Sequence, residues 1–162
     1  MNVTLRPAEL ADASEICTLI LGLAHYSTLD PSGAGAERFL ATFTREAIAG
    51  YIERSEFDYW VACDGSQLVG AAAVRKPRHL YHLFVAESHH GRGIARRLWE
   101  TLHSRMETAG DSPVTVNSTL HAVPVYQRFG FVATGPETAR DGIVFVPMEL
   151  RPAGRAEPSS SS

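Results

Sequence analysis

The sequence has 162 residues, of which 44% are hydrophobic and 20% are charged, and its formal net charge at pH 7 is -3. This length suits a single folded domain, and this composition is that of an ordinary globular protein rather than a disordered one. Because proteins that coat nucleic acids are normally basic, the acidic balance argues against a nucleic-acid partner.

The cysteines and the N-terminal segment indicate a cellular compartment. The segment MNVTLRPAELADASE lacks the apolar core and the charge layout of a signal peptide. No apolar stretch approaches the ~18 residues that a membrane span needs. Cys17 and Cys63 each lie in an apolar run, which is typical of buried free cysteines and not of a disulfide framework. We therefore expect a cytoplasmic protein without a membrane partner.

Hydrophobic periodicity and turn residues predict the elements of the first half of the chain. Apolar residues at spacings of three and four residues after Asp12 indicate one face of a helix, with Asp12 as its N-cap. The dipeptide Asp64-Gly65 indicates a hairpin, because glycine accepts the positive φ of such turns. The expected elements are a strand over 3–6, a helix over 12–26, a loop over 27–36, a helix over 44–54 and a hairpin turning at 64–65.

The second half of the sequence predicts alternating strands and helices. Ile94, Leu98, Leu102 and Met106 recur every four residues and mark the longest helix. The expected elements are strands over 78–86, 114–118, 131–134 and 143–150, with helices over 91–107 and 122–129. This order predicts an α+β (mixed α/β) fold with a mostly antiparallel sheet of about six to seven strands, flanked by about four helices. We expect one domain over 1–152 and a disordered tail over 153–162.

The most informative segment is the turn between the strand over 78–86 and the long helix. Gly91 and Gly93 remove side chains that would keep an anion away from the unpaired amides of the first helical turn. Seven of the 15 basic residues lie within 75–105, where only two acidic residues occur. Cations beside a helix N-terminus are unfavourable unless an anion joins them, so the pattern favours a polyanionic small molecule.

Two other interpretations of this turn stay open at this point. The glycines also suit a tight strand-to-helix connection with no ligand. A dinucleotide-binding unit would need G-x-G-x-x-G at the start of a βαβ unit. Here the third glycine is missing and the preceding strands are predicted to be antiparallel.

Together with a second motif, this segment resembles the GNAT superfamily of acetyl-CoA-dependent N-acetyltransferases, as a small single-domain member of bacterial type. The motifs are HLFV followed by HHGRGIA, and VNSTLHAVPVYQRFGF about thirty residues later. Residues 90–95 match the superfamily's pyrophosphate signature Gln/Arg-x-x-Gly-x-Gly/Ala, with His90 in place of the usual first residue. The resemblance covers residues 3–150.

The resemblance implies the GNAT fold, with a V-shaped opening between the strands over 79–86 and 114–118 that accepts acetyl-CoA as co-substrate. The implied cofactor-binding residues are the backbone of Leu83, Phe84 and Val85 for pantetheine, the turn formed by His90, Gly91, Arg92, Gly93, Ile94, Ala95 and Arg96 for pyrophosphate, and Asn117 near the pantetheine arm. It also implies that a backbone N–H near Phe84 or Val85, freed by a strand irregularity, holds the carbonyl oxygen.

Tyr126 is the candidate general acid. Superfamily members have a tyrosine at this position of a Y-x-x-x-G-F pattern that gives a proton to the departing thiolate. A phenol with a pKa near ~10 is a serviceable acid toward a thiol of ~8.5. The alternative is a tyrosine that only packs against the core.

For the base that removes the amine proton, the candidates are His79, Tyr81 and His82, of which we favour His79. Strand alternation predicts His79 and Tyr81 on one face and His82 with Phe84 on the other. An ordinary partly buried histidine is the competing interpretation of His79. Neither His79 with His82 nor the adjacent pair His89 and His90 converges as metal ligands should, so we expect no metal.

The sequence thus predicts an acyltransferase that moves an acetyl group from acetyl-CoA to a primary amine. Two alternatives are a CoA-binding module without turnover and a nucleotide-binding oxidoreductase. The acceptor, a small molecule or a peptide, is not readable from the sequence. The resemblance implies that its pocket is built largely by the first two helices and the loop between them over 25–36, which is the least patterned part of the chain. A homodimer also stays open.

Overall fold

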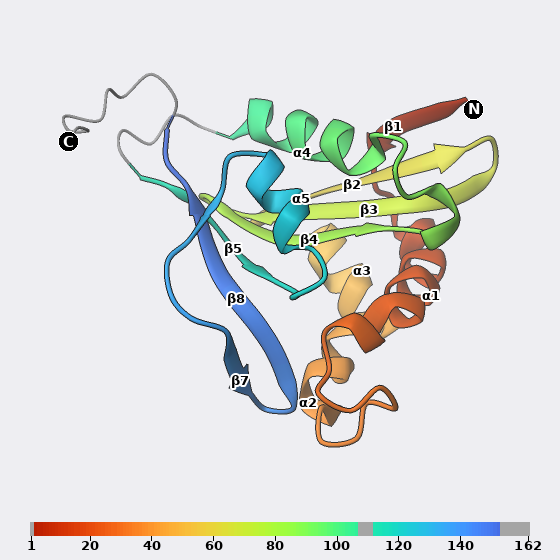
Figure 1. Ribbon diagram of the computed structural model, residues 1–162. Helices are drawn as coiled ribbons and strands as arrows, with labels where there is room; N and C mark the ends of the chain where they lie inside the picture. The colour runs from red at the N-terminus through yellow and green to blue at the C-terminus, as the bar shows by residue number, and fades with distance from the viewer. Residues whose placement is uncertain (1, 107–111, 153–162) are drawn as a thin grey trace.

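The computed structural model describes residues 2–106 and 112–152 (Figure 1). The tail over 153–162, for which we predicted disorder, lies outside the described residues. Within the described part of the chain, no helix is both long enough and apolar enough to cross a bilayer.

The described residues form one eight-stranded sheet with the order β1-β2-β3-β4-β5-β8-β6, and β7 pairs with β8 outside this path. The pair β4–β5 is parallel, and the other pairs are antiparallel. The mixed, mostly antiparallel sheet is therefore confirmed, with β7 as an addition to the expected strands. The strands are β1 (Val3–Pro7), β2 (Phe57–Asp64), β3 (Gln67–Arg75), β4 (His79–Val85), β5 (Val114–Ser118), β6 (Val132–Ala133), β7 (Thr138–Arg140) and β8 (Ile143–Leu150).

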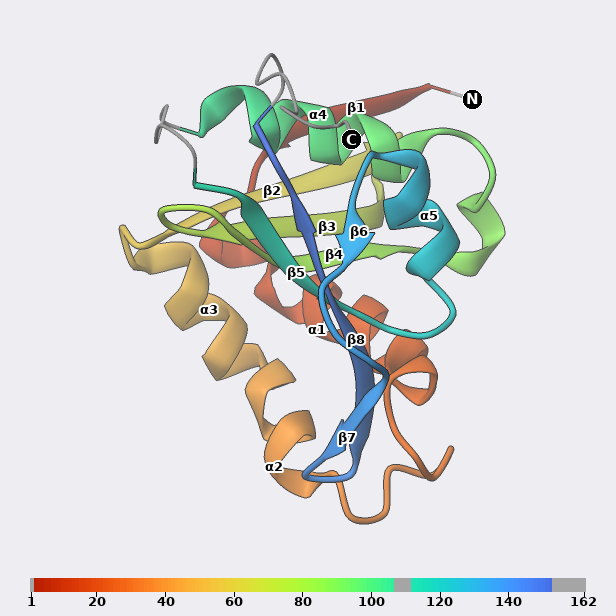
Figure 2. The same cartoon turned by 60° about the vertical axis from the view of Figure 1, so that its left-hand side comes forward.

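Five α-helices accompany the sheet within the described segments, and the short α2 was not expected. They are α1 (Ala13–Leu23), α2 (Glu37–Leu40), α3 (Arg45–Glu53), α4 (Ile94–Arg105) and α5 (Val123–Arg128). The helices α1 and α3 cover one face of the sheet, and α4 and α5 cover the other (Figures 1 and 2). Each face has its own apolar core, with Ile16, Ile20 and Ile48 on the first and Leu98 and Leu102 on the second.

The start of α1 differs from the prediction. The helix begins at Ala13, but the Asp12 carboxylate does not cap it. Arg6 instead donates two hydrogen bonds to that carboxylate, at 2.8 and 3.0 Å, and the Glu9 amide donates a third. The Arg6 contact is the main reason that the pKa of Asp12 is lowered. A cation on the neighbouring strand thus competes successfully with the helix amides for this carboxylate.

The strands β4 and β5 stay paired over only two positions, His79 with Thr115 and Leu80 with Val116. Beyond Leu80 they diverge, so the second half of β4 has no partner strand on that side. On its other side β4 remains paired with β3 up to Val85. The sheet is therefore split from one end, and the split forms the V-shaped opening that the resemblance implied.

The hairpin of β7 and β8 is joined to the loop that follows α1. Leu29 N donates to Gly142 O, and Val144 N donates to Ser27 O, each at 2.9 Å. A Cβ atom on Gly142 would lie 2.2 Å from the Gly35 carbonyl oxygen. The absence of a side chain at Gly142 therefore allows this loop and the hairpin tip to approach each other.

We predict that Gly142→Ala lowers the free energy of unfolding more than Gly65→Ala does. Both glycines have positive φ, at 80° and 62°, and placing alanine in such a conformation costs about 1–2 kcal/mol. Only the new Cβ at position 142 meets backbone atoms, because nothing lies within 4 Å at Gly65. Thermal unfolding of the two variants checks this difference, and equal losses would contradict it.

Candidate active site

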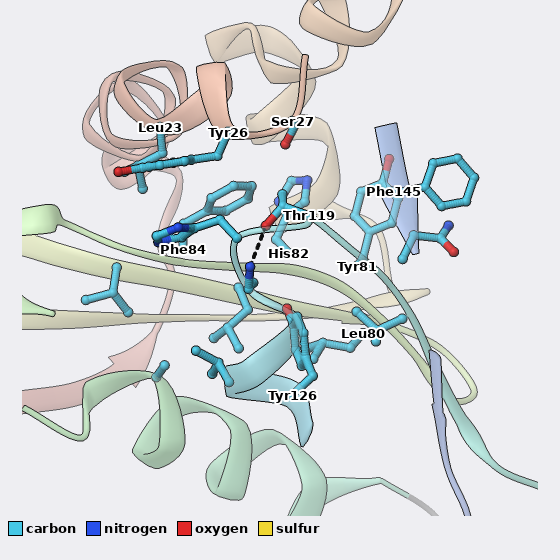
Figure 3. Close-up of a pocket in the computed structure, with 18 of the residues that line it drawn as sticks. Leu23, Tyr26, Ser27, Leu80, Tyr81, His82, Phe84, Thr119, Tyr126 and Phe145 are labelled. Atoms are coloured by element: carbon cyan, nitrogen blue, oxygen red, sulfur yellow. Dashed lines mark hydrogen bonds between the residues drawn. The ribbon is translucent and has the colours of Figure 1, made fainter. Parts of the chain in front are cut away.

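A cavity of about 780 Å³ occupies the opening between β4 and β5 (Figure 3). Its wall includes residues of α1, β4, the start of α4, β5, α5 and the β7–β8 hairpin. Of the residues predicted for the site, Arg92 alone is not part of this wall. The others are His79, Leu83, Phe84, Val85, His90, Gly91, Gly93, Ile94, Ala95, Arg96, Asn117 and Tyr126.

One end of the cavity is the turn before α4. Gly91 and Gly93 adopt φ values of 78° and 79°, and a Cβ atom on either would enter open space. Arg97 N donates to Gly93 O and makes the first hydrogen bond of the helix. The amides just before Arg97 therefore have no acceptor within α4, and the helix dipole adds partial positive charge beside them. This end can hold an anion such as a diphosphate.

The arginines of this turn point in different directions. Arg96 lines the cavity, donates to Arg128 O at 3.3 Å and lies over the Phe129 ring. Arg97 instead donates to Val3 O at 3.0 Å. Arg92 contributes to the lowered pKa of Asp64, whose main cause is a hydrogen bond with His89. Arg96 is therefore the arginine of this turn placed to add charge inside the cavity.

His90 fastens the turn to the end of β4. Its Nε2 atom lies 2.6 Å from the Val85 carbonyl oxygen and donates to it. A nitrogen donor on a planar side chain is the feature that histidine shares with the Gln or Arg of the signature. The substitution thus keeps a side chain that can donate to backbone.

The free edge of β4 offers backbone groups to a ligand. Ala86 N donates to Val69 O at 2.8 Å, so alternation along the antiparallel ladder turns the amide and carbonyl of Phe84 toward β3. The same alternation turns those of Leu83 and Val85 toward the opening. The hydrogen bond that His90 donates to the Val85 carbonyl agrees with this, because that carbonyl points away from β3.

The predicted alternation of side chains on β4 is wrong at one place. Between Ala73 and Val74 of β3 the register shifts, which leaves Tyr81 as an extra residue on β4. Such a bulge places two successive side chains on the same face. The rings of Tyr81 and His82 accordingly stack, with centroids 4.6 Å apart. The strand irregularity is therefore at Tyr81, whereas the resemblance implied one near Phe84 or Val85.

His82 lies on the cavity wall but is a poor proton acceptor. Its Nδ1 atom is 2.8 Å from the Tyr59 hydroxyl, and aromatic rings of Phe43, Tyr51 and Phe84 surround it. Burial lowers the pKa of His82 to about 3, because the imidazolium would lose its hydration. His82 is therefore neutral at physiological pH.

Tyr126 comes from α5, on the other side of the opening from His82. Its side chain is 6% exposed, and its hydroxyl is directed into the cavity (Figure 3). Burial raises the pKa of Tyr126 above its ordinary value, so the phenol keeps its proton. Within the described part of the chain, no group forms a hydrogen bond with this hydroxyl. The proton is therefore available to a ligand.

His79 lies at the closed end of the opening, where β4 and β5 still pair. Its Nδ1 atom is 2.7 Å from the Thr115 hydroxyl. Burial and the nearby charge of Arg75 lower the pKa of His79 below its ordinary value. It is therefore mainly neutral near pH 7 and able to accept a proton.

Several wall residues lie outside the predicted site, and one of them, Tyr26, belongs to the segment 25–36 that we expected to contribute to the acceptor pocket. Tyr26 stacks on His121 with ring centroids 4.3 Å apart, and its hydroxyl donates to Glu87. Arg140 and Phe145 come from the β7–β8 hairpin. The Asp141-Gly142 turn of this hairpin carries the same signal as Asp64-Gly65 and could have revealed it.

Comparison with known proteins agrees with this geometry. The family model described as "Acetyltransferase (GNAT) domain" matches residues 27–152. N-acetyltransferase 8B of Rattus norvegicus is 30% identical over 108 residues, which cover 59% of this chain and 49% of that protein. The chain thus spans about half the length of the curated relatives that it matches.

Solved structures share the fold. A GCN5-related N-acetyltransferase from Rhodopseudomonas palustris superposes with a TM-score of 0.75 at 20% identity, covering 93% of this chain and 96% of that one. The PaiA N-acetyltransferase from Thermoplasma acidophilum, solved in complex with coenzyme A, gives 0.71 at 15% identity, covering 93% and 99%. With a family model that matches most of its length, the chain belongs to the GNAT acetyltransferase domain family.

Proposed function

We propose that this protein transfers an acetyl group from acetyl-CoA directly to a primary amine. The observation that carries the proposal is the continuity of one cavity, from the glycine turn before α4, along the free edge of β4, to the Tyr126 hydroxyl. In this order along the cavity, the three features would contact the diphosphate, the pantetheine arm and the thioester of one ligand.

The residues of the cavity fit acetyl-CoA as co-substrate. Amides of residues 91–96 would bind the pyrophosphate, with Arg96 adding charge. Backbone groups of Leu83 and Val85 would pair with the amides of pantetheine, as a partner strand would. Asn117, on β5, lies across the opening from them. The proposal includes no metal ion.

In the reaction the amine nitrogen attacks the thioester carbonyl carbon, a C–N bond forms and the C–S bond breaks. The amine loses one proton and the departing sulfur gains one. We assign the second proton to Tyr126 and the first to His79 through water. A backbone N–H of the free edge of β4 would hold the charge that develops on the carbonyl oxygen.

We predict that Gly93→Ala weakens the binding of acetyl-CoA by about tenfold or more, a loss of about 1.4 kcal/mol. The new Cβ would enter the space that the pyrophosphate needs, at a residue whose φ is 79°. Isothermal titration calorimetry measures the effect. The control is Gly65→Ala, a glycine of similar φ in a distant turn. Unchanged affinity in folded Gly93→Ala would contradict the assignment of the turn.

We predict that Tyr126→Phe lowers kcat by about 10²–10⁴-fold, the usual contribution of a general acid, with little change in acetyl-CoA affinity. The substitution removes only the hydroxyl that faces the cavity. Ser104→Ala is a control, because it removes a hydroxyl that bonds to Thr101 O outside the cavity wall. An unchanged kcat in Tyr126→Phe would remove this role, and acetyl-CoA binding without transfer to any amine would favour a CoA-binding module.

We predict a change of slope in the acid limb of the pH–rate profile. The neutral fraction of an ordinary amine gives a plot of log kcat/KM against pH a slope of about one. A histidine base adds a second unit of slope at pH values below its own pKa. Because the pKa of His79 is lowered, this change lies below pH 6.5. His79→Ala should retain only the slope of the amine. His103→Ala, a half-buried histidine outside the cavity wall, is the control, and a wild-type limb in His79→Ala would exclude His79 as base.

A further inference from the structure

The end of the cavity farthest from the glycine turn is built by the β7–β8 hairpin. We call it the acceptor end and define it by Tyr81, Arg140, Ile143 and Phe145, all of which line the cavity. Figure 2 shows the hairpin tip and α4 on opposite sides of the molecule. In Figure 3, Tyr81 and Phe145 lie at the opposite end of the cavity from Tyr26.

The backbone of Arg140 is held in a fixed position. Arg140 is the last residue of β7, and Asp141 and Gly142 complete a tight turn with φ values of 55° and 80°. The hydrogen bonds from the hairpin to the loop after α1 then fix the tip against the rest of the domain. Arg140 is thus presented by a rigid turn rather than by a loose loop.

The side chain of Arg140 belongs to the face of the hairpin that lines the cavity. Arg140 pairs with Ile143, and Thr138 pairs with Phe145, so these residues share one face. The guanidinium carbon lies 5.4 Å from the centroid of the Phe145 ring. Among the described residues, no aspartate or glutamate forms an ion pair with Arg140. Its hydrogen-bond donors are therefore available to an anion.

The described wall of the cavity contains no aspartate or glutamate. Three carboxylates pair with wall residues from outside the wall: Glu87 with Tyr26, Asp64 with His89 and Glu100 with Arg96. None of them pairs with a residue of the acceptor end. An acceptor with a second ammonium group would lose hydration here and meet Arg140 without a compensating charge. The same environment lowers the pKa of a single buried amine, which favours the neutral form that reacts.

We propose that the amine acceptor also carries a carboxylate, together with an apolar or aromatic body, and that Arg140 binds this carboxylate. The proposal rests on the acetyltransferase function proposed above and names its acceptor class. The rings of Tyr81 and Phe145 would contact the apolar body, and the planar guanidinium would pair with the carboxylate through two N–H donors.

The test compares acceptors that differ only in the carboxylate, at two separations from the amine: L-phenylalanine with phenethylamine, and 4-(aminomethyl)benzoate with benzylamine. Spermidine represents polyamines. Thiol release from acetyl-CoA gives kcat/KM for each. We expect at least one carboxylate to be preferred over its neutral partner by about tenfold or more, the usual strength of a charge-assisted hydrogen bond.

Arg140→Gln should remove this preference, because it lowers kcat/KM for the carboxylates more than for their neutral partners, and Arg140→Lys should restore part of it. Arg45→Gln, which removes an exposed arginine outside the cavity, should have no effect. An equal or better rate with the neutral amines or spermidine, or a preference that survives in Arg140→Gln, would overturn the inference while acetyl transfer stands.

A binding measurement separates this inference from the proposed function. In the presence of CoA, calorimetry compares N-acetyl-L-phenylalanine with its amide, in the wild type and in Arg140→Gln. Arg140-dependent binding of the acid without transfer to any amine would support the carboxylate site and refute the acetyltransferase function. Absence of both binding and transfer would overturn both proposals.

Discussion

The parting of β4 from β5 after two paired residues is the constraint on which the site depends. A strand edge inside a protein leaves amide and carbonyl groups that need partners. Here that edge is turned into a cavity, so a ligand with amide groups of its own can supply them. The core on the α4 side includes residues of both strands, such as Val85 of β4 and Val116 of β5.

The chemistry of the cavity changes along its length. At one end, unpaired helix amides and Arg96 favour phosphate. In the middle, burial keeps Tyr126 protonated and His82 neutral. At the other end, the charged group is the exposed side chain of Arg140, which lies over the Phe145 ring. Cationic groups thus lie at both ends, and a neutral region separates them.

The bulge at Tyr81 decides which side chains of β4 reach this neutral region. Without the extra residue, His82 would face the helix α4 and Tyr81 would remain opposite it. With the bulge, both rings stack on the side of α1 and α3, where each contacts Tyr51 and His82 also contacts Phe43. This packing removes His82 from acid–base chemistry by desolvation and leaves His79 as the histidine that we assign as base.

The sequence by itself determined the element order, the mostly antiparallel sheet and the glycine turn before α4, because periodicity, glycine turns and helix starts are local properties. It also placed Tyr126 on the short helix before Gly130. Only the tertiary structure decided the partner of Asp12, the bulge at Tyr81 and the cavity wall formed by Arg140 and Phe145. Each of these depends on contacts between segments far apart in the chain. A local sequence pattern does not specify which distant backbone group or charged side chain will lie next to it.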